Sequence, residues 1–280
     1  MSAPKNKPML IPVLRLMGKN VFYHNVYQNA ASLAFYLLFA LFPILIFISN
    51  LLGLLDLDVV AMMESAQHIL PEDIIKLLET YLEYVSHTSS KRLLYFALVF
   101  SIWFPMRAAN TLMRAVRTAY HLGPPRIALV HTVKSLAYTV VFIAAIALTL
   151  SALSVSDRIL GYGVEHAALP IWVAEVWGKL RFPAVGAVGF FALCGLYVLA
   201  QDEKPLWRNI WPGTMAALGS WLVISWLYNY YVEHFAGYSA LYGSIGAVIV
   251  VLIWLNLSAA ALIMGAEMNG VLRQLRAEGK

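Results

Sequence analysis

Six windows without charged residues constrain this 280-residue chain more than any other feature. They run over residues 20–55, 93–106, 135–156, 182–201, 209–232 and 234–266. A helix needs about 20 apolar residues to cross a bilayer. Only 12% of the residues are charged, against about 25% in soluble domains. The sequence therefore predicts a polytopic membrane protein and nearly excludes a soluble fold.

The predicted fold is all-α, with six transmembrane helices in one integral membrane domain over residues 1–280. We place the spans at about 30–54, 93–113, 135–155, 182–201, 210–232 and 243–266. Two more helical segments are predicted outside the spans. The first is an interfacial helix at about 9–24, and the second is an amphipathic external segment at 56–92, which caps the bundle or lies on the outer membrane surface.

The distribution of basic residues predicts the orientation of the chain. Fourteen of the twenty Lys and Arg residues fall in the N-terminal segment and in every second connection after it, and six fall in the other connections. Cytoplasmic segments of membrane proteins carry the excess of positive charge. Both termini are therefore predicted to be cytoplasmic, and the net charge of +5 needs no nucleic-acid partner to explain it.

The second window is too short to cross a membrane alone, because 14 residues span about 21 Å at 1.5 Å per residue. The helix must continue past Arg107, which places Arg107, Asn110, Arg114 and Arg117 on one face at the inner leaflet. The three arginines form a basic stripe with two interpretations. Either they extend to the interface and contact lipid phosphates nonspecifically, or they form an anion site in a cavity.

Polar residues of the first and last spans are predicted at the same depth. The first span begins with Gln28 and Ser32 on one face, and the last ends with Glu267 and Asn269. Because a buried arginine needs a partner in a bilayer, we expect Arg107 and Glu267 to meet directly or through water. The alternative is that Glu267 ends its helix at the headgroups.

Metal, cofactor and catalytic sites receive no support from the sequence. The seven histidines show no paired-ligand spacing, and the one cysteine, Cys194, lies in an apolar window. No phosphate-binding loop of the GxxxxGK[ST] type is present, so ATP-driven transport by this chain alone is not expected. We expect no cofactor, no metal and no enzyme activity.

Several motifs resemble those of a known family. They are SLAFYLLFALFP at 32–43, WFPMRAAN at 103–110, WPG at 211–213, YSALYGSIGAVIVVLIWLNLS at 238–258 and MGAEMN at 264–269. Together they resemble the YihY/BrkB family of bacterial inner-membrane proteins over about residues 25–272. The residues that carry the resemblance best are Pro43, Tyr242, Gly243, Trp254, Gly265 and Glu267. Asn256 departs from the pattern, because the family commonly has an aromatic or apolar residue there.

The resemblance implies a six-span protein of the bacterial cytoplasmic membrane. Members were once mislabelled ribonuclease BN, and the family is associated with serum resistance, a virulence trait, and with export of envelope lipid precursors. A nuclease would need clustered metal-binding carboxylates or a His/Asp cluster, and the acidic residues of the predicted cytoplasmic segments are few and separated.

The leading hypothesis is a transporter or flippase for an anionic, lipid-like envelope molecule, with membrane lipids as partners. Its candidate substrate path comprises Gln28, Ser32, Arg107, Asn110, Asn256, Glu267 and Asn269. An ion-coupled antiporter is a variant of this hypothesis. The alternative is a membrane organiser that transports nothing and binds partners through residues 56–92 and the C-terminal tail.

Overall fold

The computed structural model describes residues 10–54, 91–125, 127–166, 171–201, 206–235 and 244–278. All regular structure in these ranges is helical, which confirms the predicted all-α fold. The elements are α1 (Leu10–Tyr23), α2 (Val26–Leu54), α5 (Lys91–Ala119), α6 (Ala128–His166), α7 (Ile171–Leu199), the short 3₁₀ turn η1 (Trp207–Asn209), α8 (Trp211–Phe235) and α10 (Ser244–Glu278).

The long helices have the length and composition of membrane-spanning segments. Within the described residues, α2, α5, α6 and α10, together with α8 and the turn before it, each contain an apolar stretch long enough to cross a bilayer. The apolar stretch of α7, Pro183–Leu199, is shorter. Each of the six predicted spans overlaps one of these helices, and α5 and α6 extend past both ends of the spans predicted for them. The chain is a multi-pass membrane protein, and its orientation stays a prediction.

The two additional predicted helices have different outcomes. A helix is confirmed at the N-terminus, where α1 covers Leu10–Tyr23, and its position at the membrane interface stays a prediction. The external segment 56–92 lies outside the described residues except for its last two, which begin α5. The basic stripe runs to the end of α5, because the helix continues twelve residues past Arg107 to Ala119 and carries Arg117 in its last turn.

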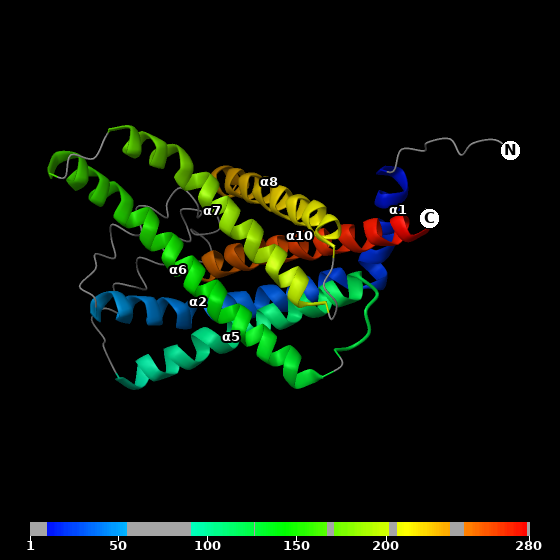
Figure 1. Ribbon diagram of the computed structural model, residues 1–280. Coiled ribbons are helices and arrows are strands. Elements are labelled where there is room, and N and C mark those ends of the chain that lie inside the picture. The colour runs from blue at the N-terminus through cyan, green and yellow to red at the C-terminus, as the bar shows by residue number, and fades with distance from the viewer. Residues whose placement is uncertain are drawn as a thin grey trace.

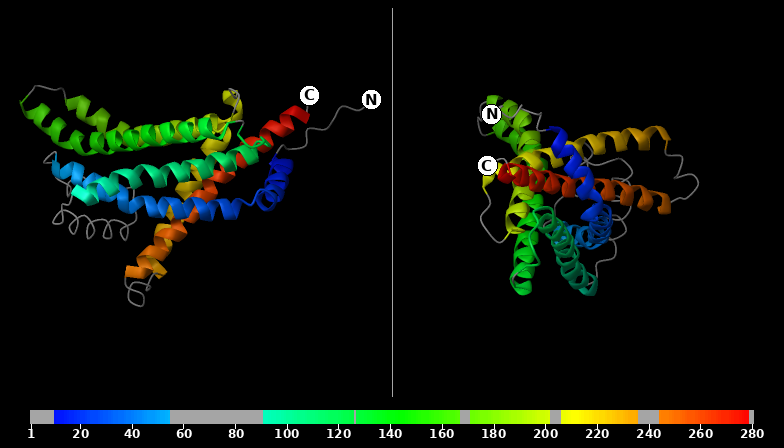
Figure 2. Two further views of the ribbon diagram at one scale, coloured as in Figure 1. Left: turned by 90° about the horizontal axis from the view of Figure 1, so that it is seen from below. Right: turned by 90° about the vertical axis from the view of Figure 1, so that its right-hand side faces the viewer.

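The bundle is organised around α10, which contacts α8, α2, α5 and α1. Figure 1 shows α1 at the same end of the molecule as the C-terminal end of α10. In Figure 2, α6 and α7 run together along one side of the α2 and α5 pair, while α8 and α10 cross it. The C-terminal half of α10 is therefore a junction between the N-terminal helix and the rest of the bundle.

Glycines allow α10 to approach its neighbours closely. A Cβ atom on Gly265 would overlap the carbonyl oxygen of Gly213 and the Cβ atom of Ala217, both on α8. A Cβ atom on Gly270 would overlap the carbonyl oxygen of Ala119 at the end of α5. Small residues at helix crossings are typical of membrane bundles, where close van der Waals packing drives association. Glu267 and Asn269 lie between these two glycines in the sequence, so the two crossings set their positions relative to α8 and α5.

Candidate functional site

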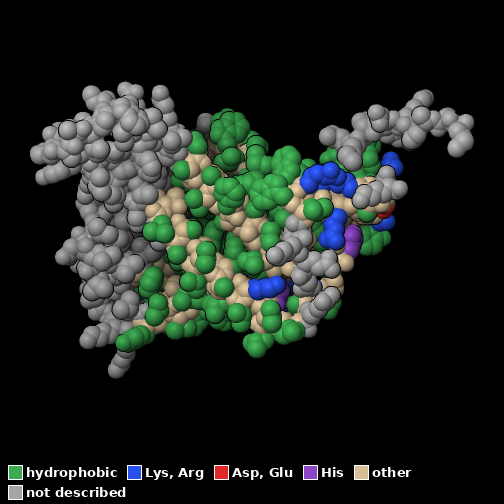
Figure 3. Space-filling view, in the orientation of Figure 1, with side chains coloured by type: hydrophobic (Ala, Val, Ile, Leu, Met, Phe, Trp, Pro, Cys, Tyr) green, Lys and Arg blue, Asp and Glu red, His purple; other side chains and the backbone are tan. Residues whose placement is uncertain are grey.

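Basic side chains gather at one end of the molecule, and apolar side chains cover its middle. Figure 3 shows the Lys and Arg side chains on this face lying toward the end that holds α1 and the C-terminal end of α10. Large apolar residues are exposed along the helices, for example Phe96 on α5 and Val141 on α6. A long apolar belt beside a basic end is the pattern expected of a bilayer-embedded chain.

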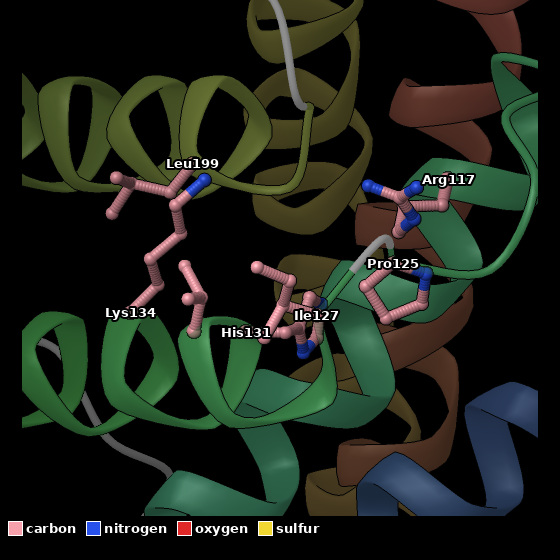
Figure 4. A pocket seen from close by; sticks show the side chains of 7 residues that line it. Arg117, Pro125, Ile127, His131, Lys134 and Leu199 are labelled. Atoms are coloured by element: carbon pink, nitrogen blue, oxygen red, sulfur yellow. The ribbon is translucent and has the colours of Figure 1, made fainter.

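A cleft opens at the basic end, between the C-terminal half of α5, the connection that follows it and the start of α6. Its volume is about 340 Å³. It is lined by Asn110, Arg114, Arg117, Thr118, Leu122, Gly123, Pro124, Pro125, Ala128, His131 and Thr132. A smaller cavity of about 100 Å³ shares Arg117, Pro125 and His131 with it and adds Lys134 of α6 and Leu199 of α7 (Figure 4). Within the described residues, no Asp or Glu lines either cavity.

Asn110 places an unsatisfied polar atom at this cleft. The residue is 7% exposed, and its Oδ1 has no hydrogen-bond partner among the described residues. A buried acceptor without a partner costs about 1–3 kcal/mol. A ligand hydroxyl or N–H group in the cleft would satisfy it. Asn110 was predicted as a path residue, and the structure places it in a cleft beside Arg114, which is exposed.

Arg117 is the buried member of the predicted basic stripe. It is 4% exposed. Its Nε and Nη2 donate to the carbonyl oxygen of Gly123 at 3.0 and 2.7 Å, and its Nη1 donates to the carbonyl oxygen of Ala200 at 3.0 Å. Arg117 therefore ties the connection after α5 to the end of α7. It shapes the wall of the cleft, and the choice between the two interpretations of the basic stripe stays a prediction.

Arg107 faces α2 and does not contact Glu267. Its Nη2 donates to the Tyr36 hydroxyl at 3.4 Å, and its guanidinium lies 5.5 Å from the centre of the Tyr36 ring. Its Nε is buried and has no partner within the described part of the chain. The predicted direct contact between Arg107 and Glu267 is wrong, because α2 supplies Tyr36 to the arginine and α1 supplies the partners of the carboxylate.

Glu267 is fully buried on α10. Its Oε1 lies 2.7 Å from His24 Nδ1, and its Oε2 accepts a hydrogen bond from Asn20 Nδ2 at 3.2 Å. The His24 ring also meets the His121 ring edge to face, with 5.3 Å between their centres. The alternative that Glu267 ends its helix is wrong as well, because α10 continues to Glu278.

The remaining predicted residues do not join this cluster. Gln28 and Ser32 are exposed on α2, and Asn256 is exposed on α10. Asn269 is buried and caps α8: its Oδ1 accepts from the Gly213 amide and its Nδ2 donates to the Ile210 carbonyl oxygen, both at 2.7 Å. Among the motif residues, Pro43 lies inside α2 and Trp254 donates to Ser225 of α8. Tyr242 and Gly243 lie outside the described residues.

Sequence reasoning missed the residues that complete these sites. His131 and Lys134 are three residues apart, so one helix face at the start of α6 carries both. Their spacing, just after a short connection from the arginine stripe, was a usable signal. No local pattern pointed to His24, which is 243 residues from Glu267.

Comparison with known proteins identifies the family. The family model of the virulence factor BrkB matches residues 19–280. The chain belongs to the BrkB family. The ribonuclease-like protein YfkH of Bacillus subtilis (strain 168) is 31% identical over 257 residues, which cover 90% of this chain and 91% of YfkH.

More distant relatives are UPF0761 membrane proteins. The UPF0761 membrane protein Smlt0865 of Stenotrophomonas maltophilia (strain K279a) is 21% identical over 281 residues, and the match covers 99% of this chain and 64% of Smlt0865. The chain thus spans less than two-thirds of that relative. A UPF0761 membrane protein of Xanthomonas campestris pv. campestris (strain B100) is 26% identical over 105 residues, 38% of this chain and 24% of its own length. No solved structure matches the chain.

Proposed function

We propose that this BrkB-family chain transports an anionic lipid of the bacterial cytoplasmic membrane and binds its headgroup in the cleft between α5 and α6. The observation that carries the proposal is the lining of the cleft, with Arg114, Arg117 and the unsatisfied Asn110 oxygen, and of the adjoining smaller cavity, which adds Lys134. No Asp or Glu among the described residues lines either cavity. A guanidinium presents a planar fork of donors that suits phosphate. In the proposed orientation the cleft and both termini face the cytoplasm.

The ligand chemistry follows from the two kinds of polar group in the cleft. Arg114 in the cleft and Lys134 in the adjoining smaller cavity supply positive charge and N–H donors for a phosphate group. Asn110 Oδ1 accepts a hydrogen bond, so it fits a hydroxyl or amide N–H carried by the same headgroup. A volume of about 340 Å³ is at the lower end of small-molecule sites, which span roughly 300–1,000 Å³. The proposed ligand is a phosphate-bearing headgroup with hydroxyl or amide donors.

The surroundings of the cleft suit a molecule whose tails stay in lipid. Beside the cleft, the start of α6 exposes a set of large apolar side chains to the outside of the bundle: Ile127, Leu129, Val130 and Val133. Acyl chains can lie on this surface while the headgroup enters between α5 and α6. Arg107 lies two helical turns along α5 from Arg114, at a greater predicted depth in the membrane, and contacts Tyr36 on the α2 side of the helix.

Lipid retention tests the proposal. The protein is extracted into native nanodiscs, and retained lipids are quantified by mass spectrometry for wild type, Arg114→Gln and Arg15→Gln. Arg15 is an exposed arginine on α1 outside the cleft, so its variant controls for loss of one surface charge. Enrichment of one anionic lipid that is lost in Arg114→Gln and kept in Arg15→Gln supports the site. Equal retention of bulk lipid by all three proteins overturns it.

Transport is tested separately with that lipid. Proteoliposomes containing a fluorescent analogue of the enriched lipid report leaflet exchange through quenching by a membrane-impermeant reductant. We expect exchange above that of protein-free vesicles and its loss in Arg114→Gln. Binding without exchange would favour the membrane organiser in place of a transporter.

A nuclease activity is not proposed for this chain, although the name of YfkH is ribonuclease-like. Hydrolysis of a phosphodiester with metal assistance needs carboxylate or histidine ligands grouped around the ion. The cleft is instead lined by cationic side chains. Among the described residues that line it, His131 is the one whose side chain is of a metal-ligand type, carboxylate or imidazole. The arrangement supports binding of a phosphate group rather than its hydrolysis.

A further inference from the structure

We propose that His24 and Glu267 form a proton-binding site outside the cleft, and that the bound proton holds α1 against α10. The site connects elements from opposite ends of the sequence. His24 follows the last residue of α1, and Glu267 lies within the C-terminal half of α10. The proposal does not depend on the identity of the transported molecule.

The geometry requires a proton between the two side chains. His24 Nδ1 and Glu267 Oε1 are 2.7 Å apart, which is the length of a charge-assisted hydrogen bond. The carboxylate is fully buried, and its other oxygen is bound by Asn20, a neutral amide. A buried carboxylate is costly to ionise unless a positive charge compensates it. A charged His24 supplies that compensation.

The exchangeable proton has a route to solvent through the histidine. The His24 side chain is 13% exposed, whereas that of Glu267 is 0% exposed. With the proton bound, imidazolium and carboxylate sum to zero charge. When the imidazolium releases one proton to water, the pair becomes a buried net charge of minus one. The hydrogen bond from a neutral imidazole then remains, but the compensating charge is lost, so docking of α1 weakens as pH rises through the histidine range.

The other charged groups on the packed elements include the exposed Arg15 of α1 and Arg114 of α5, and several that contact other residues. On α1, Lys19 lies over the Tyr23 ring. On α10, Arg273 lies over the Tyr120 ring, and Arg276 donates to the carbonyl oxygen of Arg208 and to Asn209. On α5, Arg117 binds the Gly123 and Ala200 carbonyl oxygens.

His121 is the titratable group that faces His24 from the connection after α5. Its ring centre is 5.3 Å from that of His24, so two charged rings would repel each other. His121 also has a positive φ of 54°, a backbone conformation that a residue other than glycine seldom adopts. The next residues, Leu122 and Gly123, line the cleft. Movement of His24 with α1 therefore removes a contact that supports one wall of the cleft.

Hydrogen–deuterium exchange of the full chain in nanodiscs of phosphatidylcholine and phosphatidylglycerol tests the proposal without any transported ligand. Exchange is measured at about pH 5.5 and about pH 8, on either side of the range where histidine changes charge, and corrected for intrinsic rates. We expect α1 peptides to exchange faster at the higher pH, because loss of the compensating positive charge beside the buried Glu267 weakens the docking of α1. Peptides across His121 should follow in the same direction.

Two variants make the result decisive. Glu267→Gln removes the buried charge, so α1 exchange should lose its pH dependence. His24→Gln is unable to take up the proton, so α1 should exchange rapidly at both pH values, and this variant decides the matter if Glu267→Gln does not fold. His166→Gln, at the end of α6 far from α1 (Figure 1), is the matched control and should keep the wild-type response. A pH-independent wild type, or a response that persists in His24→Gln, overturns the proposal.

Discussion

Asn269 on α10 accepts a hydrogen bond from the backbone amide of Gly213 in the first turn of α8, with 2.7 Å between Oδ1 and N. Its Nδ2 donates to the Ile210 carbonyl oxygen just before that helix. One buried side chain therefore satisfies a free amide at the start of α8 and a carbonyl oxygen of the preceding turn. This cap joins the last two helices of the bundle at the basic end, close to Glu267.

Replacing this cap should destabilise the protein. We expect Asn269→Ala to lower the free energy of unfolding by about 1–3 kcal/mol, because it leaves the buried Gly213 amide without a partner, whereas the Ile210 carbonyl oxygen keeps its hydrogen bonds from Thr214. Thermal unfolding in detergent, followed by intrinsic fluorescence, measures the change. Asn256→Ala is the matched control on the same helix, since Asn256 is exposed and its loss should leave the melting temperature within about 2 °C. Equal melting temperatures for both variants would contradict the capping role.

The contact between Gly265 and Gly213 gives a second prediction. Gly265→Ala places a methyl group against the Gly213 carbonyl oxygen and the Ala217 Cβ atom, so α8 and α10 must separate. Overpacking of this kind costs about 1–3 kcal/mol. Gly219→Ala is the control, because a Cβ atom on Gly219 meets nothing within 4 Å among the described residues. Thermal unfolding of both variants checks the expectation, which fails if Gly265→Ala is as stable as Gly219→Ala.

The helices were predictable because their signal is local. Charge-free windows of membrane length mark each spanning helix regardless of its neighbours, and all six predicted spans fall on observed helices. The span over α5 was extended past Arg107 because its charge-free window was too short, but it was ended at about residue 113, whereas α5 continues to Ala119 and carries Arg114 and Arg117 inside the helix. A guanidinium on a long side chain can reach carbonyl oxygens, ring faces or the interface while the backbone stays helical.

The partners of polar residues were less predictable, because pairing depends on packing between distant segments. Asn110 and Arg114 were placed together because they share a face of one helix, and this required only helical periodicity. Charge alone suggested Arg107 as the partner of Glu267. The structure instead brings His24 across 243 residues and gives Arg107 an aromatic partner, Tyr36. Complementary charge is thus a weak guide when neutral donors and rings from other helices lie closer.

Arg117 and Arg114 should differ in what their substitution affects. Arg117→Lys retains the charge but loses the fork that binds the Gly123 and Ala200 carbonyl oxygens together, so it should destabilise the protein by about 1–3 kcal/mol. Arg114→Lys changes an exposed side chain and should stay within about 0.5 kcal/mol of wild type. Thermal unfolding of the two variants distinguishes the buried, structural arginine from the exposed one. A larger loss in Arg114→Lys would show that the assignment is reversed.

A negative charge placed in the cleft gives a test that keeps the fold intact. Asn110→Asp is nearly isosteric and puts a carboxylate in a cleft lined by Arg114 and Arg117, so the fold should be retained or stabilised. The same carboxylate competes with the phosphate group for these cations, so retention of an anionic lipid should fall at least about tenfold, the equivalent of about 1.4 kcal/mol.

Thr132→Asp is the control for this variant. It also adds a charge to the lining, but at an exposed position on α6, and should reduce retention less. Lipid mass spectrometry and thermal unfolding of the same samples separate binding from folding. Undiminished retention in a folded Asn110→Asp protein would place the headgroup elsewhere, with the Arg107 and Tyr36 contact on the α2 side of α5 as the next position to test.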